Sequence, residues 1–500
     1  MFGQIKKLLG HSAVYGLGAM AASLCTLVLA PIYLRRMGLA EYGRVQLLNS
    51  FASIMTTVLT LGVASVLPKM FIHDCTNEDD RKKLLSSAIG FAAFSALTMF
   101  VICWALSGRL ALALCNGTEY RSHVLMAASY GGLMLIQQVS VIYLRIRQWP
   151  QKFVAVSITQ ISLILILNIV LVWYARLGVR GVQISSLCSC IVSLCLAAVL
   201  VRPGLSANIS LKMVKHVLRL AIPVAPATMV PWVLNVSDRY FIKHSHGLAD
   251  TGLYSIGYQI GMMGLIVLIN AFQWAWGPFY QTHCDEPGAD RMCAKIGKYY
   301  VLILTFIGLM VSVFAPEIIR VLSRKELWTP DRLHSCALIV PLVSLSYVLN
   351  GIQVFTIPVF MRRDCGKRLS VIMGAIALLN IGLNFFIIPI FGIWGAVGTT
   401  LLCFGAGSVV CIAASNRIFH IPFEYANYAK LLIVSAGLYL VFGHLSGSIF
   451  KILLLKSCTP IIFAGLLAVV KFADPTEVGK IRSIRSRVMR RFGLHACDPA

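Results

Sequence analysis

The stretch GLAEYG fills residues 38–43, and a near copy of it, GLADTG, fills residues 247–252. The segments before the two copies correspond at the same offset of 209 residues, because IKKLLGHSAVYG at 5–16 matches the pattern of VKHVLRLAIPVA at 214–225. The chain therefore contains an internal duplication. Its organisation depends on how many structural elements separate the two copies.

The composition is that of a membrane protein. Of the 500 residues, 58% are hydrophobic and 13% are charged, and the mean hydropathy is +0.80. A water-exposed surface needs far more polar coverage than this. Apolar runs of about 20 residues, long enough to cross about 30 Å of hydrocarbon, are predicted fourteen times. They lie near residues 12–33, 46–68, 84–107, 122–144, 153–174, 181–201, 214–235, 253–276, 299–319, 335–359, 369–390, 393–414, 428–446 and 449–470.

The repeat fixes how these spans are arranged. GLAEYG follows the first span and GLADTG follows the seventh, so each copy holds six spans. Six is even, so both copies enter the membrane from the same side, and parallel repeats of this kind imply two lobes with a substrate path between them. A second echo pairs LNIVLVWYARLGVRGV at 167–182 with LNFFIIPIFGIWGAV at 383–397, which aligns Gly178 with Gly392.

We therefore predict an all-α polytopic membrane protein with about fourteen transmembrane helices, because lipid leaves no backbone group unpaired and the runs are too apolar for barrel strands. The predicted units are an N-lobe with helices 1–6 (1–203), a C-lobe with helices 7–12 (204–418), helices 13–14 (419–471) and a basic cytoplasmic tail (472–500). In the tail, an apolar stripe among arginines predicts an interfacial helix on anionic lipids. A simple orientation anchor is the alternative. The stripe consists of Ile481, Ile484, Val488 and Phe492.

Positive charge orients the bundle. With a cytoplasmic amino terminus, 29 of the 44 Lys and Arg residues fall on the inner side and 15 on the outer side. Because short inner loops retain positive charge, both termini are predicted to be cytoplasmic. Arg35, Arg36, Arg44 and the run 320–332 fall on the outer side, against this rule. They either have a function there or belong to the ordinary scatter of a statistical bias.

Three stretches carry a family resemblance: RRMGLAEYGRVQLL, SDRYFIKHSHGLADTGLYSIGYQIG and LNIGLNFFIIPIFGIWGAVGTTLL. They resemble motifs of polysaccharide transporters in the multidrug/oligosaccharidyl-lipid/polysaccharide exporter superfamily, the group that contains O-antigen flippases. The resemblance implies a bacterial inner-membrane protein that is not an enzyme, uses no cofactor and moves an undecaprenyl-pyrophosphate-linked oligosaccharide to the outer leaflet by alternating access. It implies a role in O-antigen, lipopolysaccharide or exopolysaccharide biosynthesis. A polysaccharide polymerase and a chain-length regulator are the candidate partners.

Polar side chains inside the spans suit such a cargo. A diphosphate and its sugars cannot cross hydrocarbon uncovered, so a flippase needs a polar cavity that carries positive charge. Amides at helical spacing mark one face of spans 8, 10 and 11. They are Gln259, Asn270, Gln273, Asn350, Gln353, Asn380 and Asn384. The alternative for each amide is a hydrogen bond that holds two helices together.

Charged groups and prolines add further candidates. Asp238 and Arg239 are adjacent near the outer end of span 7, where an ionisable pair marks a functional site or locks the end of the helix. The cations predicted to line the path are Arg239, Lys69, Arg145 and Arg147, the last three being equally suited to anchor helix ends. A bend in span 7, either a hinge or a static kink, is predicted from Pro223, Pro226 and Pro231.

Two other function classes were weighed. A cation-coupled drug antiporter of the same superfamily would need a buried carboxylate, and the first six spans contain none. A membrane polysaccharide polymerase would be expected to carry catalytic carboxylates or histidines in a large outer loop, which is lacking. The cysteines lack paired metal-ligand spacing, so no metal site is predicted. The net charge of +25 reflects topology and contact with anionic lipids, not nucleic-acid binding.

The charge distribution predicts where each loop lies. Reporter fusions at Asp80, Asp364 and Ala500 should report the cytoplasm, and fusions at Gly117 and Asp331 should report the periplasm. The measurement is the activity of a phosphatase that folds only outside the cytoplasm. A periplasmic signal from Ala500 would contradict an even number of spans.

Overall fold

The computed structural model describes residue 25 and residues 28–472, apart from positions 76, 207, 224, 323–329, 363–364 and 444–448. The described part of the chain is almost entirely helical and contains no strand. The all-α polytopic fold predicted from the sequence is confirmed.

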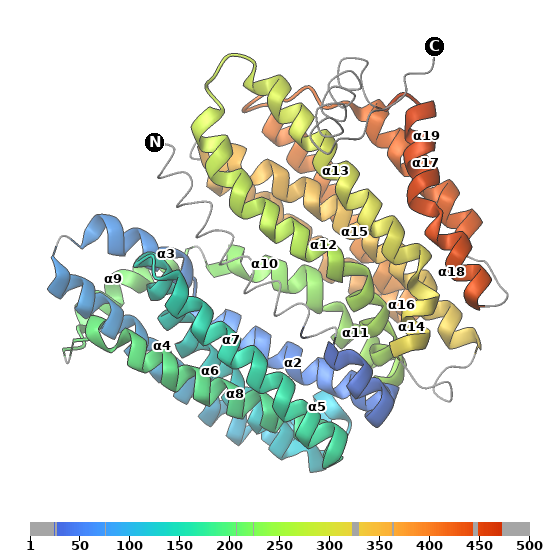
Figure 1. The fold of residues 1–500 in the computed structure, drawn as a ribbon. Coiled ribbons are helices and arrows are strands. Elements are labelled where there is room, and N and C mark those ends of the chain that lie inside the picture. The colour runs from blue at the N-terminus through green and yellow to red at the C-terminus, as the bar shows by residue number, and fades with distance from the viewer. Residues whose placement is uncertain are drawn as a thin grey trace, which may run out of the picture.

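The helices follow one another with short connections, drawn in Figure 1. N-lobe and C-lobe denote the units 1–203 and 204–418 predicted from the sequence. The described part of the N-lobe contains a helical segment over residues 28–37, α2 (Leu39–Thr60), α3 (Val63–Lys69), α4 (Glu78–Ala105), α5 (Ser107–Cys115), α6 (Arg121–Ile146), α7 (Pro150–Asn168) and α8 (Gly178–Val201). The C-lobe comprises α9 (Leu211–Ala221), α10 (Ala225–Val236), α11 (Asp238–His246), α12 (Leu248–His283), α13 (Ala289–Val313), α14 (Ala315–Leu322), α15 (Pro330–Arg362) and α16 (Gly366–Asn416). It is followed by α17 (Tyr425–Phe442), α18 (Ile449–Ser457) and α19 (Thr459–Val469). Single turns of π-helix (Met70–Asp74 and Ile169–Tyr174) and of 3₁₀-helix (Thr118–Tyr120 and Arg202–Gly204) complete the described helical elements.

The described helices include ten to eleven candidate membrane spans. Ten of the described helices are long and apolar enough to cross a membrane, and α2 with α3, bent by 45°, counts as an eleventh. Helix α16 contains two predicted spans, because its 51 residues would extend for about 76 Å, more than twice the hydrocarbon thickness. It bends at Gly392, where φ is 57° and ψ is −130°. The predicted total of fourteen is not confirmed, and most of span 1 and the predicted tail helix lie outside the described residues.

The two lobes contact each other where the duplicated loops lead into α2 and α12. A Cβ atom on Gly43 would overlap the carbonyl oxygen of Leu248, and a Cβ atom on Gly252 would overlap that of Leu39. Gly43 corresponds to Gly252 in the repeat, and Leu39 corresponds to Leu248. The same contact is therefore made twice, as happens across a two-fold axis. The close approach of the two backbones requires glycine at both positions.

Matching positions of the two repeats also share backbone conformations. Gly38 and Gly247, which precede α2 and α12, have φ values of 79° and 89°. Gly178 and Gly392, paired by the second sequence echo, have φ values of 54° and 57°. Positive φ is accessible to glycine at little cost, so the repeated glycines preserve the repeated turns.

Further inter-lobe contacts lie at the same end of the molecule as the glycine crossing. The Arg35 guanidinium donates to the carbonyl oxygen of Val321 in α14 over 2.6 Å, and the Lys243 ammonium in α11 donates to the carbonyl oxygen of Ala113 in α5 over 2.5 Å. Figure 1 shows α2 and α5 approaching α11 and α14 here, while α3 and α9 lie at the opposite end of the N-lobe. The charge rule predicts that the joined ends face the periplasm.

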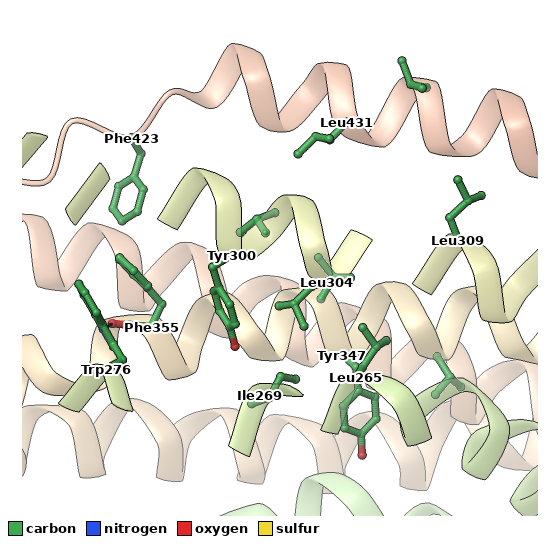
Figure 2. Packing of buried hydrophobic residues seen from close by; sticks show 14 of the residues in the cluster. Leu265, Ile269, Trp276, Tyr300, Leu304, Leu309, Tyr347, Phe355, Phe423 and Leu431 are labelled. Atoms are coloured by element: carbon green, nitrogen blue, oxygen red, sulfur yellow. Dashed lines mark hydrogen bonds between the residues drawn. The ribbon is translucent and has the colours of Figure 1, made fainter. Parts of the chain in front are cut away.

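The C-lobe has a core of stacked aromatic rings between α12, α13 and α15 (Figure 2). The rings of Trp276 and Phe355 stack at a centroid distance of 4.7 Å, and Phe272 stacks on Tyr300 at 3.7 Å. The indole nitrogen of Trp276 donates to the carbonyl oxygen of Phe355 over 2.9 Å, which satisfies its only polar atom. Figure 2 also shows Phe423 and Leu431, from the chain around α17, directed at this core.

Two buried lysines attach the C-terminal helices to the C-lobe. Lys456 in α18 has no exposed surface and donates to both carboxylate oxygens of Glu317 in α14, over 2.8 and 2.9 Å. Lys298 in α13, equally buried, lies 3.0 Å from Glu424, just before α17. Because removing one partner of a buried ion pair leaves an unpaired charge, these pairs constrain where the helices dock.

The glycine crossing can be tested by overpacking. Gly43→Val should lower the thermal stability of the detergent-purified protein, at a cost of about 1–3 kcal/mol or more, because the obstructing atom belongs to the backbone and cannot rotate away. Gly382→Val in α16 is the matched control, since a Cβ atom there has no atom within 4 Å apart from its own helix backbone and chain neighbours. The measurement is the melting temperature by size-exclusion chromatography after heating. Equal melting temperatures for the two variants would contradict the close crossing.

Candidate functional site

A cavity of about 800 Å³ lies beside the crossing, between the N-lobe and the first helices of the C-lobe. Most of its wall comes from α2, α6 and α7, and α10, α11 and α12 each contribute one or two residues. Its lining is unusual for a hydrophobic protein, because many hydroxyl and amide side chains are interspersed among the apolar ones. The cavity is therefore a polar space inside a membrane protein.

Helix α2 supplies the main polar stripe of the cavity. Its lining residues are Gln46, Asn49, Ser53, Thr56, Thr57 and Thr60. Successive members are mostly three or four residues apart, which places them on one face of a helix. The sequence analysis missed this stripe, although the signal was present in QLLNSFASIMTTVLT at residues 46–60. The cavity residues predicted from the sequence are amides and charged groups, so this set of hydroxyls is not among them.

Amides of α6 and α7 face α2 across the cavity. Gln138 and Gln160 both line it, and Gln138 accepts a hydrogen bond from the hydroxyl of Thr60 over 3.5 Å. The side chain of Gln160 accepts a hydrogen bond from that of Gln137 over 3.0 Å. These groups offer both donors and acceptors, so the wall suits a ligand that carries many hydroxyl groups.

Arg239 is the only cationic side chain among the described residues that line this cavity. It is the second residue of α11 and is 9% exposed. Its guanidinium lies 5.6 Å from the ring centre of Tyr258 and donates to the Ser50 hydroxyl over 3.5 Å. Within the described part of the chain, Nε of Arg239 has no hydrogen-bond partner. A buried guanidinium with spare donors favours a carboxylate or phosphate ligand.

The Asp238 side chain, unlike that of Arg239, does not line the cavity. Its carboxylate accepts hydrogen bonds from the hydroxyl of Tyr254 and, over 2.9 Å, from the backbone amide of Arg239. It is 2% exposed and does not line the cavity. Among the described residues, no carboxylate oxygen lies within 4.0 Å of the Arg239 guanidinium, so the two neighbours do not form a side-chain ion pair.

Gln259 reaches the cavity, whereas the other predicted amides do not line it. Gln259 accepts a hydrogen bond from the hydroxyl of Tyr42 over 2.7 Å, across the two lobes. Asn380 and Asn384 are buried in a network with Ser237 and Thr399, which joins the break between α10 and α11 to the two halves of α16. This is the geometry expected of interhelical hydrogen bonds.

The remaining amides lie elsewhere on the C-lobe. Gln353 is 2% exposed and donates to the carbonyl oxygen of Phe404 over 3.1 Å, so it links α15 to α16. Asn350 is half-buried one turn earlier on α15, Asn270 is half-buried on α12, and Gln273 is exposed on α12. Amides at the same helical spacing thus line the cavity, link two helices or are exposed. Sequence periodicity alone does not distinguish these three positions.

The three inner-side cations lie outside the cavity lining. Lys69 is exposed at the end of α3, and Arg145 is exposed near the end of α6, with its guanidinium 4.6 Å from the ring centre of Phe153. Arg147 pairs with Glu78, with Nη1 3.0 Å from Oε1, and donates to the Tyr143 hydroxyl over 3.1 Å. Of the four cations predicted to line a path, the cavity itself holds only Arg239.

The predicted seventh span is broken in two places. Pro223 lies in the turn between α9 and α10, and positions 226 and 231 lie within α10. A second break separates α10 from α11 at Ser237, directly before Asp238. The prolines remove backbone hydrogen-bond donors in this region, which accounts for the first break in the helix. Whether the breaks act as hinges stays a prediction.

The described residues of the site offer groups that bind a ligand and no evident set of groups that would catalyse a reaction. No described carboxylate lines the cavity, and no group of His, Cys, Asp and Glu that could hold a metal ion occurs among the described residues. The lining provides hydroxyls, amides and one positive charge. It can therefore solvate a polar, negatively charged ligand inside a membrane protein.

Comparisons with known proteins agree with this reading. The sequence model of the family described as polysaccharide biosynthesis protein matches residues 8–281. No curated protein sequence matches the chain. Among solved structures, the lipid II flippase MurJ in an inward closed conformation has a TM-score of 0.75 at 13% identity, over 91% of this chain and 98% of that one. These values show a shared fold.

Two transporter structures are also similar. An inward-facing multidrug resistance MATE family transporter of the MOP superfamily has a TM-score of 0.63 at 13% identity, over 79% of this chain and 94% of that one. A MOP superfamily transporter from Pyrococcus furiosus has a TM-score of 0.60 at 14% identity, over 82% and 95%. Because the identities are low, these structures show a shared fold and assign neither a role nor a substrate to this chain.

Proposed function

The chain belongs to the polysaccharide biosynthesis protein family, and we propose that it is a flippase for an undecaprenyl-pyrophosphate-linked oligosaccharide. The observation that carries this proposal is the polar cavity between the lobes, with Arg239 as its single described cation. In this proposal the cargo is moved across the bacterial inner membrane for O-antigen, lipopolysaccharide or exopolysaccharide biosynthesis.

The cargo and the cavity are chemically matched. A diphosphate carries negative charge, and its favourable partner in a low-dielectric site is a guanidinium with free donors, as on Arg239. The sugar hydroxyls need hydrogen-bond donors and acceptors, which the α2 stripe, Gln138 and Gln160 supply. The prenyl chain needs only hydrocarbon, so it stays in the bilayer while the headgroup crosses.

The described conformation fits the inward-facing half of an alternating-access cycle. The glycine crossing and the hydrogen bonds of Arg35 and Lys243 hold the lobes together at the end predicted to be periplasmic. Release of the two hydrogen bonds, with the glycine crossing as the pivot and approach of the lobes at the cytoplasmic end, would expose the cavity to the outer leaflet. Lys69, Arg145 and Arg147, at the cytoplasmic end, are proposed to attract the diphosphate before it enters.

A drug antiporter is the alternative that the MATE structures keep open. Such an antiporter needs a carboxylate that exchanges a cation for the drug, and Asp238 is the buried carboxylate nearest the cavity. Its carboxylate is occupied by Tyr254 and the Arg239 amide and faces away from the lining. A positively charged cavity also disfavours cationic drugs, so the flippase is the better account.

The proposed partners and location follow from the cargo. Both termini are proposed to be cytoplasmic in the inner membrane, with anionic lipids around the basic inner loops. A polysaccharide polymerase and a chain-length regulator would receive the flipped oligosaccharide at the periplasmic side. The protein itself needs no catalytic group for this step.

The proposal is tested by the sidedness of the cargo. In cells that lack the protein, the lipid-linked oligosaccharide should be protected from a glycan-cleaving enzyme added at the periplasmic side, and restored protein should make it accessible. Arg239→Ala should lose this activity, and Arg239→Lys should recover part of it as a point charge. Arg109→Ala, an exposed arginine outside the cavity, is the control and should behave as wild type.

Three outcomes would contradict the proposal. Unchanged accessibility with glycan chains reduced to single units would indicate a polymerase. Unchanged accessibility together with sensitivity to cationic drugs would indicate the antiporter. Full activity of Arg239→Ala at normal protein levels would remove the cationic cavity as the basis of transport.

A further inference from the structure

A second pocket, of about 550 Å³, lies at the outer end of the N-lobe, separate from the central cavity. Its wall is formed by the end of the segment 28–37, the first turn of α2, the start of α6 and the turn that leads into α8. It lies at the end of the molecule where the lobes are joined and where the charge rule predicts the periplasm. The central cavity shares no lining residue with it, and of its residues only Arg35 has a place in the proposed transport cycle.

Arginine dominates this pocket. Arg35, Arg36, Arg176 and Arg180 line it, with Glu41 as the single described carboxylate in the wall. No carboxylate in the described part of the chain lies within 4.0 Å of any of these four guanidinium groups. The pocket thus concentrates four positive charges against one negative charge, in a place where the positive-inside rule disfavours positive charge.

Two of the arginines are held in place. The Arg36 guanidinium stacks 4.2 Å from the ring centre of Trp173, and its Nε is buried without a hydrogen-bond partner among the described residues. Arg176 has a φ of 56° and is followed closely by Gly178 with a φ of 54°, so a tight turn orients the start of α8. A non-glycine residue in this backbone region is strained and marks a position fixed by its surroundings.

We propose that this pocket binds a phosphate or diphosphate group at the outer face of the membrane. Four guanidinium groups around one pocket repel one another unless an anion compensates them, and guanidinium groups bind phosphate oxygens through paired hydrogen bonds. The group belongs either to an anionic lipid headgroup of the outer leaflet or to the diphosphate of the cargo after it has crossed. The cargo diphosphate as the source rests on the proposed function, whereas binding of a phosphate group to this pocket does not.

The pocket is linked to the joint between the lobes through Arg35. Its Nη2 atom donates to the carbonyl oxygen of Val321 in the C-lobe over 2.6 Å, while the side chain also lines the pocket. A bound phosphate competes with this carbonyl oxygen and, being charged, forms the stronger hydrogen bond. Occupancy of the pocket therefore favours separation of the outer ends, which would couple arrival of a phosphate group to outward opening.

Binding of inorganic pyrophosphate to the full chain, in nanodiscs of phosphatidylcholine, tests the proposal by calorimetry. All samples carry Arg239→Gln, so that the central cation does not contribute. Pyrophosphate should bind, and the further double substitution Arg176→Ala/Arg180→Ala should weaken binding by about ten-fold or more, because two exposed donors to phosphate are lost. Arg109→Ala, an outer-side arginine outside the pocket, should leave the affinity unchanged.

Nanodiscs that contain phosphatidylglycerol identify the source of the phosphate. If a lipid headgroup fills the pocket, pyrophosphate binding should weaken in these discs, and the double substitution should abolish the difference. If binding is unaffected, the diphosphate of the cargo is the source, and both results support the pocket. Absence of binding, or equal affinity with and without the double substitution, would overturn it. If the protein does not make the lipid-linked oligosaccharide accessible in the sidedness assay but still binds pyrophosphate, the proposed flippase function is rejected and the proposed phosphate site is retained.

Discussion

The close crossing of α2 and α12 is the constraint on which the rest of the structure depends. Gly43 and Gly252 bring two helix backbones together where any side chain would overlap a carbonyl oxygen of the other lobe. Because the contact is reciprocal, it sets the axis that relates the lobes. The polar face of α2 then continues from the crossing into the central cavity, and Arg239 and Gln259 complete the wall from the C-lobe.

Charge is distributed in a way that agrees with this arrangement. The central cavity holds one described guanidinium among neutral polar groups, the outer pocket holds four, and exposed lysines and arginines gather at the end predicted to be cytoplasmic. A negatively charged headgroup would meet positive charge at the entrance, in the cavity and at the exit. Carboxylates pair with lysines at the periphery instead, as Glu317 and Glu424 do where α18 and α17 attach.

The sequence predicted the fold better than it predicted the cavity. The duplicated glycines were visible because a turn with positive φ and a close backbone contact both demand the same residue type, and Gly178 and Gly392 have nearly equal φ values. Amides gave a weaker signal, because Asn384 and Gln259 look alike in sequence while one joins α11 to α16 and the other lines the cavity. Which face of a helix meets water and which meets another helix depends on tertiary contacts that periodicity does not contain.

The central claim is that the lobes rock about the glycine crossing, and spin-label distances test it most directly. Labels at Lys69 and His283 report on the inner ends, and labels at Arg109 and Asp331 report on the outer ends, after replacement of the exposed Cys188, Cys195 and Cys458. When undecaprenyl pyrophosphate is added to the protein in nanodiscs, the account predicts a population in which the inner distance shortens while the outer distance lengthens. Two distances that stay constant, or that change in the same direction, would contradict it.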